Sequence, residues 1–219
     1  MTKQNPYCYL GTEILKNSYG IQDQRKLTDM ETIVTTSRFM ELINKPIKGN
    51  FSLSHLSQIH RYLFQDIYEF AGKIRTINIS KDGFPFAGMQ YIKQEAEKLT
   101  AHLRSESYLI GFPLPLFSER AAHYMAEINI LHPFPEGNGR TQREMIRLMA
   151  LNAGFVLDWS IQSPVDIFNA SVRSAVITDR LANVIQTSII NTTPNQDLMN
   201  SICEINLQNR KTSNIKRGR

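Results

Sequence analysis

The segment from His132 to Arg143 contains the residue types with which a phosphate group could be bound and transferred. Gly137 and Gly139 flank Asn138, so the backbone can adopt positive φ angles there and turn successive N–H groups toward one point, an arrangement suited to anions. A helix is predicted to begin directly afterwards. Its unpaired N–H groups and the positive end of its dipole would also favour a bound phosphate.

Two arginines and two titratable groups complete this segment. Arg140 and Arg143, three residues apart, project from nearly the same face of the first helical turn. Cations at a helix N-terminus are unfavourable by themselves, so their position indicates an anionic ligand. Glu136 offers a hard carboxylate suited to Mg²⁺ that is shared with substrate oxygens. His132 titrates near neutrality and could accept a proton from an attacking hydroxyl.

This spacing alone suggests phosphoryl or nucleotidyl transfer from a magnesium nucleotide. A single His-Pro or Gly-Asn-Gly would more often be an ordinary helix connector, but here all the elements fall within one short segment. The P-loop, zinc-protease helix and nucleophile-elbow motifs are absent from the sequence. The other histidines show no metal-ligand spacing, and we expect surface or hydrogen-bonded core roles for His55, His60, His102 and His123.

At these residues the sequence resembles the Fic family of protein adenylyltransferases, whose signature H-P-F-x-[DE]-G-N-G-R-x-x-R is filled at every fixed position. The resemblance extends through residues 5–7, 15–17, 20–21 and 59–75, and covers most of the chain up to about residue 190. Within the family, the sequence most resembles the small bacterial toxins, whose antitoxin is a separate protein. ATP would be the substrate and Mg²⁺ the cofactor.

The resemblance implies a role for each residue of the motif. A hydroxyl of a target Ser, Thr or Tyr would attack the α-phosphate of ATP and release pyrophosphate. The implied roles are general base for His132, Mg²⁺ ligand for Glu136, phosphate binding for Gly137, anion hole for Asn138 and Gly139, polyphosphate contact for Arg140 and γ-phosphate contact for Arg143. A sister branch, the death-on-curing kinases, carries Lys where Gly139 stands, so Gly139 favours transfer of AMP over phosphorylation.

A β-hairpin is predicted over about residues 74–88. Polar and apolar residues alternate up to Lys81, and the turn pair Asp82-Gly83 and a second apolar run follow. By the resemblance this hairpin is the family's flap, an edge to which a target segment adds as a strand. A packing ribbon is the simpler alternative. The predicted docking residues are Ile77, Ile79, Phe84 and Phe86.

Many Fic proteins are inhibited by a helix with the pattern [ST]-x-x-x-E-[GN], whose glutamate pairs with the second motif arginine, here Arg143. The nearest match begins at Ser37 and reaches Glu41, but Leu42 follows where Gly or Asn is required. We therefore expect inhibition in trans, by a small antitoxin that supplies the inhibitory helix.

The remaining patterns predict a mainly α fold, and the resemblance implies a Fic-type helical bundle with a short β-hairpin flap. Apolar periodicity and capping residues predict helices over 53–70, 92–105, 118–131, 140–153, 164–174, 179–190 and 195–207. We expect one domain over residues 1–206 and a basic, disordered tail over 207–219.

Composition limits the other possibilities. The net charge of +5 comes from that tail, which holds five of the 25 basic residues and no acid. We therefore expect no stable binding to nucleic acid or membranes. Cys8 and Cys203 form neither a disulfide framework nor a zinc site. No apolar signal core follows the N-terminus, so a cytoplasmic location in a bacterium is expected, and secretion into host cells stays open.

Three functions remain open. The first is a toxin-like adenylyltransferase, for which the resemblance offers DNA gyrase and topoisomerase IV as possible targets. The second is a secreted effector that modifies host proteins with AMP. The third is a catalytically idle binding module, which ranks last because no position of the motif is degenerate.

Overall fold

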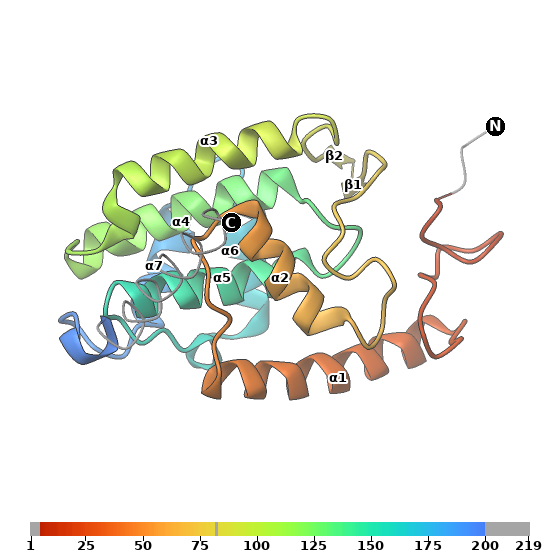
Figure 1. Cartoon of the computed structure of the whole chain (residues 1–219), viewed down its shortest axis with the longest axis horizontal. Helices are drawn as coiled ribbons and strands as arrows, with labels where there is room; N and C mark the ends of the chain where they lie inside the picture. Colours follow the sequence, from red (N-terminus) through yellow and green to blue (C-terminus); the bar gives the residue numbers. More distant parts are fainter. Residues whose placement is uncertain (1–4, 82, 200–219) are drawn as a thin grey trace, which may run out of the picture.

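The computed structural model describes residues 5–81 and 83–199, which form a helical bundle with a small hairpin beside it (Figure 1). The strands β1 (Ser80–Lys81) and β2 (Phe84–Pro85) pair in antiparallel fashion. The mainly α class with a short β-hairpin is thereby confirmed. The helices are α1 (Gln24–Asn44), α2 (Leu53–Phe64), α3 (Ile92–Ser105), α4 (Leu114–Leu131), α5 (Asn138–Asn152), α6 (Pro164–Arg173) and α7 (Asp179–Thr187), with 3₁₀ turns at Ser107–Leu109 and Trp159–Ile161.

Helix α4 lies at the centre of the bundle and packs against α3, α5 and α7 (Figure 1). It buries the small residues Ala121, Ala122 and Ala126, which let neighbouring helices approach closely. Helix α2 packs between α1 and α5. The connection from α4 to α5 lies in the motif segment, and a backbone hydrogen bond from Arg75 N–H to Pro133 joins it to the hairpin region. A second bond, from Ala87 N–H to Ile130, joins that region to the end of α4.

Helix α1 is present in the structure, but the apolar periodicity did not predict it. Only Leu27, Thr35 and Leu42 are buried along it, while Ile33 and Met40 are exposed. Its apolar residues therefore do not form the continuous stripe by which an amphipathic helix is detected. The helix is capped by Asp23, whose carboxylate accepts a hydrogen bond from Lys26 N–H at 3.0 Å.

The helix predicted over 53–70 is too long, because α2 ends at Phe64. The following apolar residues Ile67, Tyr68 and Phe70 are buried, but they lie in turns. The rings of Tyr68 and Phe70 stack at a centroid distance of 4.6 Å. The sequence pattern of apolar residues therefore continues beyond the end of the helix, because these residues are buried in an irregular segment.

Of the other predicted helices, α3 has the predicted bounds, and α4, α5, α6 and α7 are present with shifted ends. Helix α4 begins at Leu114 instead of residue 118. Ser118, the first residue of the predicted helix, lies inside α4, and its hydroxyl donates to the Leu114 carbonyl. Helix α5 begins at Asn138 instead of residue 140. Helix α7 ends at Thr187, and the helix predicted over 195–207 is described only as far as residue 199. Asp82, Cys203 and the tail over 207–219 lie outside the described residues.

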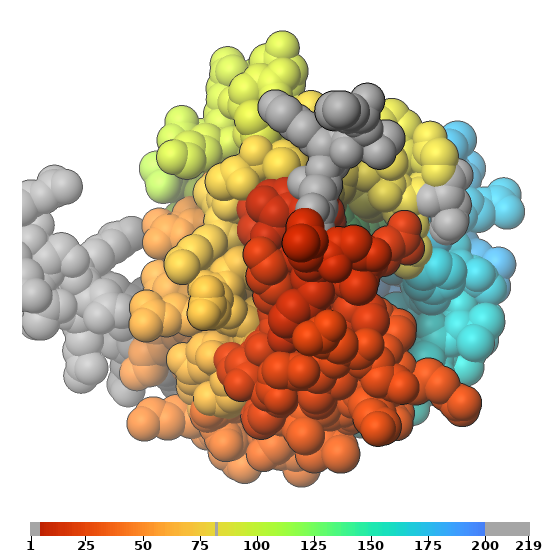
Figure 2. Space-filling model, turned by 90° about the vertical axis from the view of Figure 1, so that its right-hand side faces the viewer, coloured from red at the N-terminus to blue at the C-terminus, as the bar shows by residue number. Residues whose placement is uncertain are grey.

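The N-terminal segment lies across the face shown in Figure 2, where its red residues cover part of the yellow segment that leads to the hairpin. The hydroxyl of Tyr7 accepts a hydrogen bond from Thr76 N–H at 2.8 Å, and the Tyr7 ring packs edge-on against Phe70. The N-terminal segment therefore packs against the residues that lead into the hairpin and stabilises them. None of the helices in the described part of the chain combines the length and apolar character needed to cross a membrane.

Candidate active site

His132 is the residue that ends α4, and its backbone is left-handed, with φ of 42° and ψ of 61°. This conformation costs a residue with a Cβ about 1–2 kcal/mol, and such strain is often found at functional sites. Its N–H still donates to the Ile128 carbonyl at 3.0 Å, so the helix is closed normally. The turn redirects the chain from α4 into the loop that contains Glu136 and Gly137.

The imidazole of His132 is oriented for use as a base. Its Nδ1 lies 3.3 Å from the carbonyl oxygen of Asn129, which can only accept, so in the neutral ring Nδ1 carries the hydrogen and Nε2 keeps its lone pair. The ring of Phe86 stacks on it at a centroid distance of 3.7 Å. Burial lowers the pKa of His132 to about 4, and the positive charges of Arg75 and Lys81 act in the same direction. At neutral pH the ring is therefore unprotonated, as a general base requires.

Acidification should destabilise the protein through His132 and His60, because burial also lowers the pKa of His60 to about 4. Both folded-state values lie below the ordinary 6.5, so between pH 6.5 and 4 the unfolded chain binds more protons than the folded one. Stability is complete above pH 6.5 and is lost as the pH falls toward 4. At pH 5 we expect a loss of about 2 kcal/mol for each histidine.

Thermal unfolding at pH 7 and pH 5 measures this loss. The decrease in Tm should become smaller in the His132→Asn variant. It should stay unchanged in His102→Asn, since the side chain of His102 is 53% exposed. An equal Tm for the wild-type protein at the two pH values would contradict the assigned burial.

The loop between α4 and α5 is held by side chains that point into it. Gly137 has φ of +81°, and a Cβ there would lie 2.4 Å from the Phe64 ring, so only glycine fits. The side chain of buried Asn138 accepts from Phe134 N–H at 3.0 Å and donates to the Phe134 carbonyl at 2.8 Å. Because these bonds occupy the amide group of Asn138, it is the backbone N–H of this residue that is left for an anion.

His60 holds the loop between α4 and α5 by a hydrogen bond to its backbone. Its Nδ1 accepts from Gly72 N–H at 2.8 Å, so Nε2 carries the hydrogen and donates to the Glu136 carbonyl, also at 2.8 Å. The imidazole stacks on Phe134 at a centroid distance of 3.9 Å. The expectation of a hydrogen-bonded core histidine is confirmed for His60, and its contact with the motif is an addition that the sequence did not predict.

The first turn of α5 is open toward an anion. No side chain caps this helix, whose N-cap residue is Gly137. A Cβ at Gly139 would meet one atom within 4 Å, Nη1 of Arg143 at 3.5 Å, so the Arg143 guanidinium lies over this turn. Burial and the charge of Arg140 lower the pKa of Arg143. Its guanidinium makes no ion pair with any carboxylate of residues 5–81 and 83–199, so it is free to meet a phosphate.

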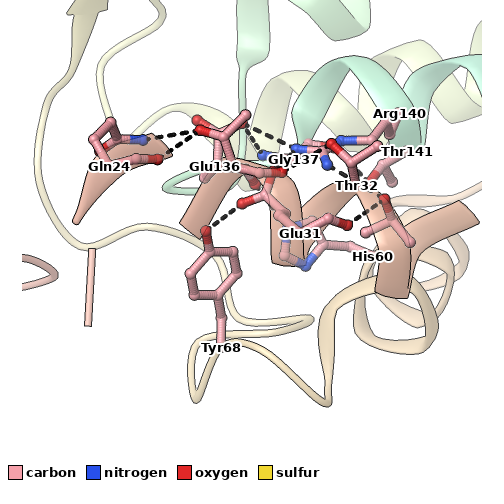
Figure 3. A network of polar contacts seen from close by, with 11 residues as sticks. Gln24, Glu31, Thr32, His60, Tyr68, Glu136, Gly137, Arg140 and Thr141 are labelled. Atoms are coloured by element: carbon pink, nitrogen blue, oxygen red, sulfur yellow. Dashed lines mark hydrogen bonds and ion pairs between the residues drawn. The ribbon is translucent and has the colours of Figure 1, made fainter. Parts of the chain in front are cut away.

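Arg140 is fixed by a network that reaches α1 (Figure 3). Its guanidinium forms an ion pair with Glu31, lies 4.8 Å from the centroid of the Phe64 ring and is 3.5 Å from the hydroxyl of Thr35. The hydroxyl of Tyr68 donates to the other oxygen of Glu31. Arg140 is thus held beside the loop, with part of its hydrogen-bonding capacity used by Glu31.

Glu136 is the carboxylate of the motif, and its side chain is 48% exposed. One oxygen accepts from Gly137 N–H at 2.8 Å and lies 3.5 Å from Nη2 of Arg140. No group of three or more His, Cys, Asp or Glu side chains is placed to hold a metal ion within the described part of the chain. A single accessible carboxylate fits a metal ion such as Mg²⁺ that takes its other ligands from substrate phosphates and water.

The four predicted flap residues have different surroundings. Ile77 and Ile79 are half-buried, and the Ile79 carbonyl accepts from Phe86 N–H at 3.2 Å. Phe84 is 51% exposed, at a centroid distance of 6.5 Å from Phe86. Phe86 itself covers His132. The hairpin therefore lies beside the candidate base His132, and Phe84 is its exposed aromatic side chain.

Four residues of the site were missed by sequence reasoning: Glu31, His60, Tyr68 and Arg75. Glu31, His60 and Arg75 hold a motif residue or its backbone directly, and Tyr68 holds Glu31. Arg75 donates from its guanidinium to the His132 carbonyl at 2.8 Å. The only available signal was their type, a charged or polar residue within an apolar segment, and it does not identify the partner.

The sequence model of the Fic/DOC family matches residues 50–150. A similar relative is the protein adenylyltransferase VbhT of Bartonella schoenbuchensis, 41% identical over 170 residues, which are 78% of this chain and 36% of VbhT. The chain thus spans about a third of that relative. The probable protein adenylyltransferase Fic of Escherichia coli strain K12 is 38% identical over 156 residues, which are 71% of this chain and 77% of that protein.

The fold is also similar to a solved structure. The BepC protein of Bartonella tribocorum, described as a VirB-translocated effector protein and crystallised with bound AMPPNP, superimposes with a TM-score of 0.80 at 26% identity. The alignment covers 85% of this chain and 97% of the BepC chain. The similarity therefore includes nearly all of a domain that binds an ATP analogue.

Proposed function

The chain belongs to the Fic/DOC family, in which its relatives are named protein adenylyltransferases, and from this premise we propose that it transfers AMP from ATP to a Ser, Thr or Tyr hydroxyl of a target protein. The observation that carries the proposal is an unprotonated His132 at the start of the loop that leads to α5, with Nδ1 directed to Asn129. At the N-terminus of α5, Arg143 lies over the first turn without a carboxylate partner in the described residues.

In the proposed reaction, Nε2 of His132 accepts the proton of the target hydroxyl as its oxygen bonds to the α-phosphorus. The bond from that phosphorus to the bridging oxygen breaks, and pyrophosphate leaves with the electron pair. The backbone N–H groups of Asn138 and Gly139 would stabilise the charge that develops on the α-phosphate oxygens. Arg140 would contact the polyphosphate while it is held by Glu31, and Arg143 would bind the γ-phosphate.

Mg²⁺ is the proposed cofactor, with Glu136 as its protein ligand. The exposed carboxylate of Glu136 beside the helix N-terminus supports this assignment, since Mg²⁺ commonly binds one or two carboxylates together with substrate phosphates. When bound, the ion would neutralise charge on the phosphates. The chain's own residues supply the base and the remaining phosphate contacts.

The proposed partner of the hairpin is an extended segment of the target protein, added as a strand. Backbone pairing recognises little sequence, so a side chain must orient the target residue. Because Phe86 is stacked on His132, we assign this contact to the exposed Phe84, with Ile77 and Ile79 supporting the edge.

The biological role that we propose first is that of a bacterial toxin, with DNA gyrase and topoisomerase IV as possible targets, inhibited by a separate antitoxin. The contacts of Glu41 support inhibition in trans: its carboxylate accepts from Arg38 of α1 at 3.0 Å and from Tyr62 of α2 at 2.5 Å. It therefore has partners other than Arg143.

If inhibition is supplied in trans, the isolated chain should be active with ATP and the Glu41→Gly variant should be equally active. Incorporation of labelled AMP by the two proteins measures this. A wild-type chain that is inactive until Glu41 is replaced would show that the inhibitory carboxylate is internal, which is the opposite of the proposal.

A secreted effector that modifies host proteins is the second candidate, favoured by the similarity to BepC, which is described as a translocated effector. Intact-protein mass spectrometry distinguishes the candidates, after incubation of the chain with Mg·ATP and either bacterial or animal-cell lysate. A gain of one AMP on a lysate protein, absent with His132→Ala, supports adenylyl transfer and identifies the source of the target. A gain of one phosphate instead would indicate a kinase, and no gain in either lysate would favour an idle module.

A further inference from the structure

Arg75 is a buried arginine between the hairpin and the end of α4. It is 2% exposed, and no carboxylate of the described residues forms an ion pair with it. A buried charge must be balanced by hydrogen bonds or by other charges. The partners of Arg75 are therefore informative about what it does.

Among residues 5–81 and 83–199, the hydrogen-bond partners of the guanidinium are backbone carbonyls. On one side, Nε donates to His132 at 2.8 Å and Nη2 donates to Leu131 at 3.2 Å. On the other side, Nη1 donates to Ile77 at 2.8 Å and Nη2 donates to Ala87. One planar group thus joins the two ends of the hairpin region to the two residues that end α4.

The end of α4 is suited to this cation. The last carbonyls of a helix lack intrahelical partners and carry the negative end of its dipole. The guanidinium satisfies two of them, and arginine keeps its charge when buried more readily than lysine. The helix terminus therefore replaces the carboxylate that Arg75 lacks.

These bonds determine how His132 and Phe86 face each other. The carbonyl of His132 is fixed at a residue whose left-handed backbone is strained, and Ala87 is the neighbour of Phe86 in the chain. The rings of Phe86 and His132 are nearly parallel, at 15°. A change in the bonds of Arg75 would move the base and the hairpin relative to each other.

We propose that Arg75 is a positioning residue, which sets the hairpin and the catalytic imidazole of His132 in one common geometry for transfer, an inference that rests on the proposed function. It touches neither reacting group. Lysine cannot replace it, because one ammonium group lacks the planar fork that reaches carbonyls in two directions.

The test compares Arg75→Lys with a matched control, Arg147→Lys. Arg147 is also a poorly exposed arginine, but it pairs with Glu144 within α5 at 2.8 Å. We expect both variants to lose stability. Arg75→Lys alone should lower the rate of transfer about 100-fold, the effect of a misplacement of about 1 Å, while the Kd for ATP changes less than twofold.

A second readout follows the imidazole itself. In a ¹H–¹⁵N NMR titration, with the signals assigned by comparison with His132→Ala, the pKa of His132 should rise toward 6.5 in Arg75→Lys as the stacked ring loosens. It should stay at the wild-type value in Arg147→Lys. This readout does not depend on transfer, so it tests Arg75 even if the chain proves to have another activity.

Two results would overturn the proposal. The first is that folded Arg75→Lys transfers AMP at the wild-type rate. The second is that its rate of transfer falls no more than that of Arg147→Lys while the pKa of His132 in Arg75→Lys stays at the wild-type value. If Arg75→Lys does not fold, hydrogen exchange in the wild-type protein decides. The Nε–H of Arg75 should exchange as slowly as the backbone N–H of Ala87, which donates to Ile130. Rapid exchange of that Nε–H would show that the bond to His132 is not maintained.

Discussion

The His132→Ala variant should transfer AMP 10²–10⁴ times more slowly than the wild-type protein, the range expected for the loss of a positioned general base. The imidazole has Nδ1 directed to Asn129 and Nε2 free, so its removal takes away the proton acceptor. The Kd for ATP should be nearly unchanged, because the phosphate contacts that we propose belong to α5. Steady-state transfer and calorimetric titration with ATP measure the two quantities.

His123→Ala is the matched control, since His123 lies on the same helix α4 and is also partly buried. It should have little effect on transfer. A loss of ATP affinity in His132→Ala as large as the loss of rate would mean that His132 binds the nucleotide and does not act as a base.

The second large effect is expected for Arg143→Ala. The guanidinium lies over the first turn of α5 and has no carboxylate partner in the described part of the molecule, so a γ-phosphate would be its charged partner. A charge-assisted hydrogen bond of this kind contributes about 1.5–3 kcal/mol, which corresponds to a rise of about ten- to a hundredfold in the Kd for ATP. The Kd for ADP, which lacks that phosphate, should change much less.

Arg104→Ala is the control for this variant, because Arg104 is an exposed arginine in the last turn of α3. Isothermal titration of the wild-type protein and the two variants with ATP and ADP gives the six affinities that are needed. Equal losses for ATP and ADP would assign Arg143 to the α- or β-phosphate, and no loss for either would remove it from the nucleotide site.

Arg140 and Arg143, the two arginines of the motif, have different environments, because Arg140 forms an ion pair with Glu31. Arg140 pairs with Glu31, which Tyr68 holds, and lies against the Phe64 ring, whereas no carboxylate of the described residues pairs with Arg143. A fixed cation loses less side-chain freedom when a phosphate arrives, but part of its charge is already balanced. We therefore expect Arg140 to orient the polyphosphate and Arg143 to supply the larger part of the binding energy.

The linear motif was predictable because its geometry is local. Gly137, Asn138 and the first turn of α5 are consecutive, so positive φ, unpaired N–H groups and the spacing of Arg140 and Arg143 follow from neighbouring residues alone. The same holds for helices with a strong apolar stripe, such as α3, whose predicted bounds match the structure. The hairpin was marked by alternation and a turn pair, although each strand is only two residues long.

Only the tertiary structure decided which residues hold the motif in place. Glu31 meets Arg140 across 109 residues, His60 meets Glu136 across 76, and Arg75 meets His132 across 57. Periodicity reports which face of a helix is apolar, but it carries no information about which distant group a polar side chain will meet. Helix α1, which brings Glu31 to the site, buries too few apolar residues to show a pattern. Its place is fixed by packing against α2, and the sequence by itself therefore determined the motif's chemistry while the packing determined its support.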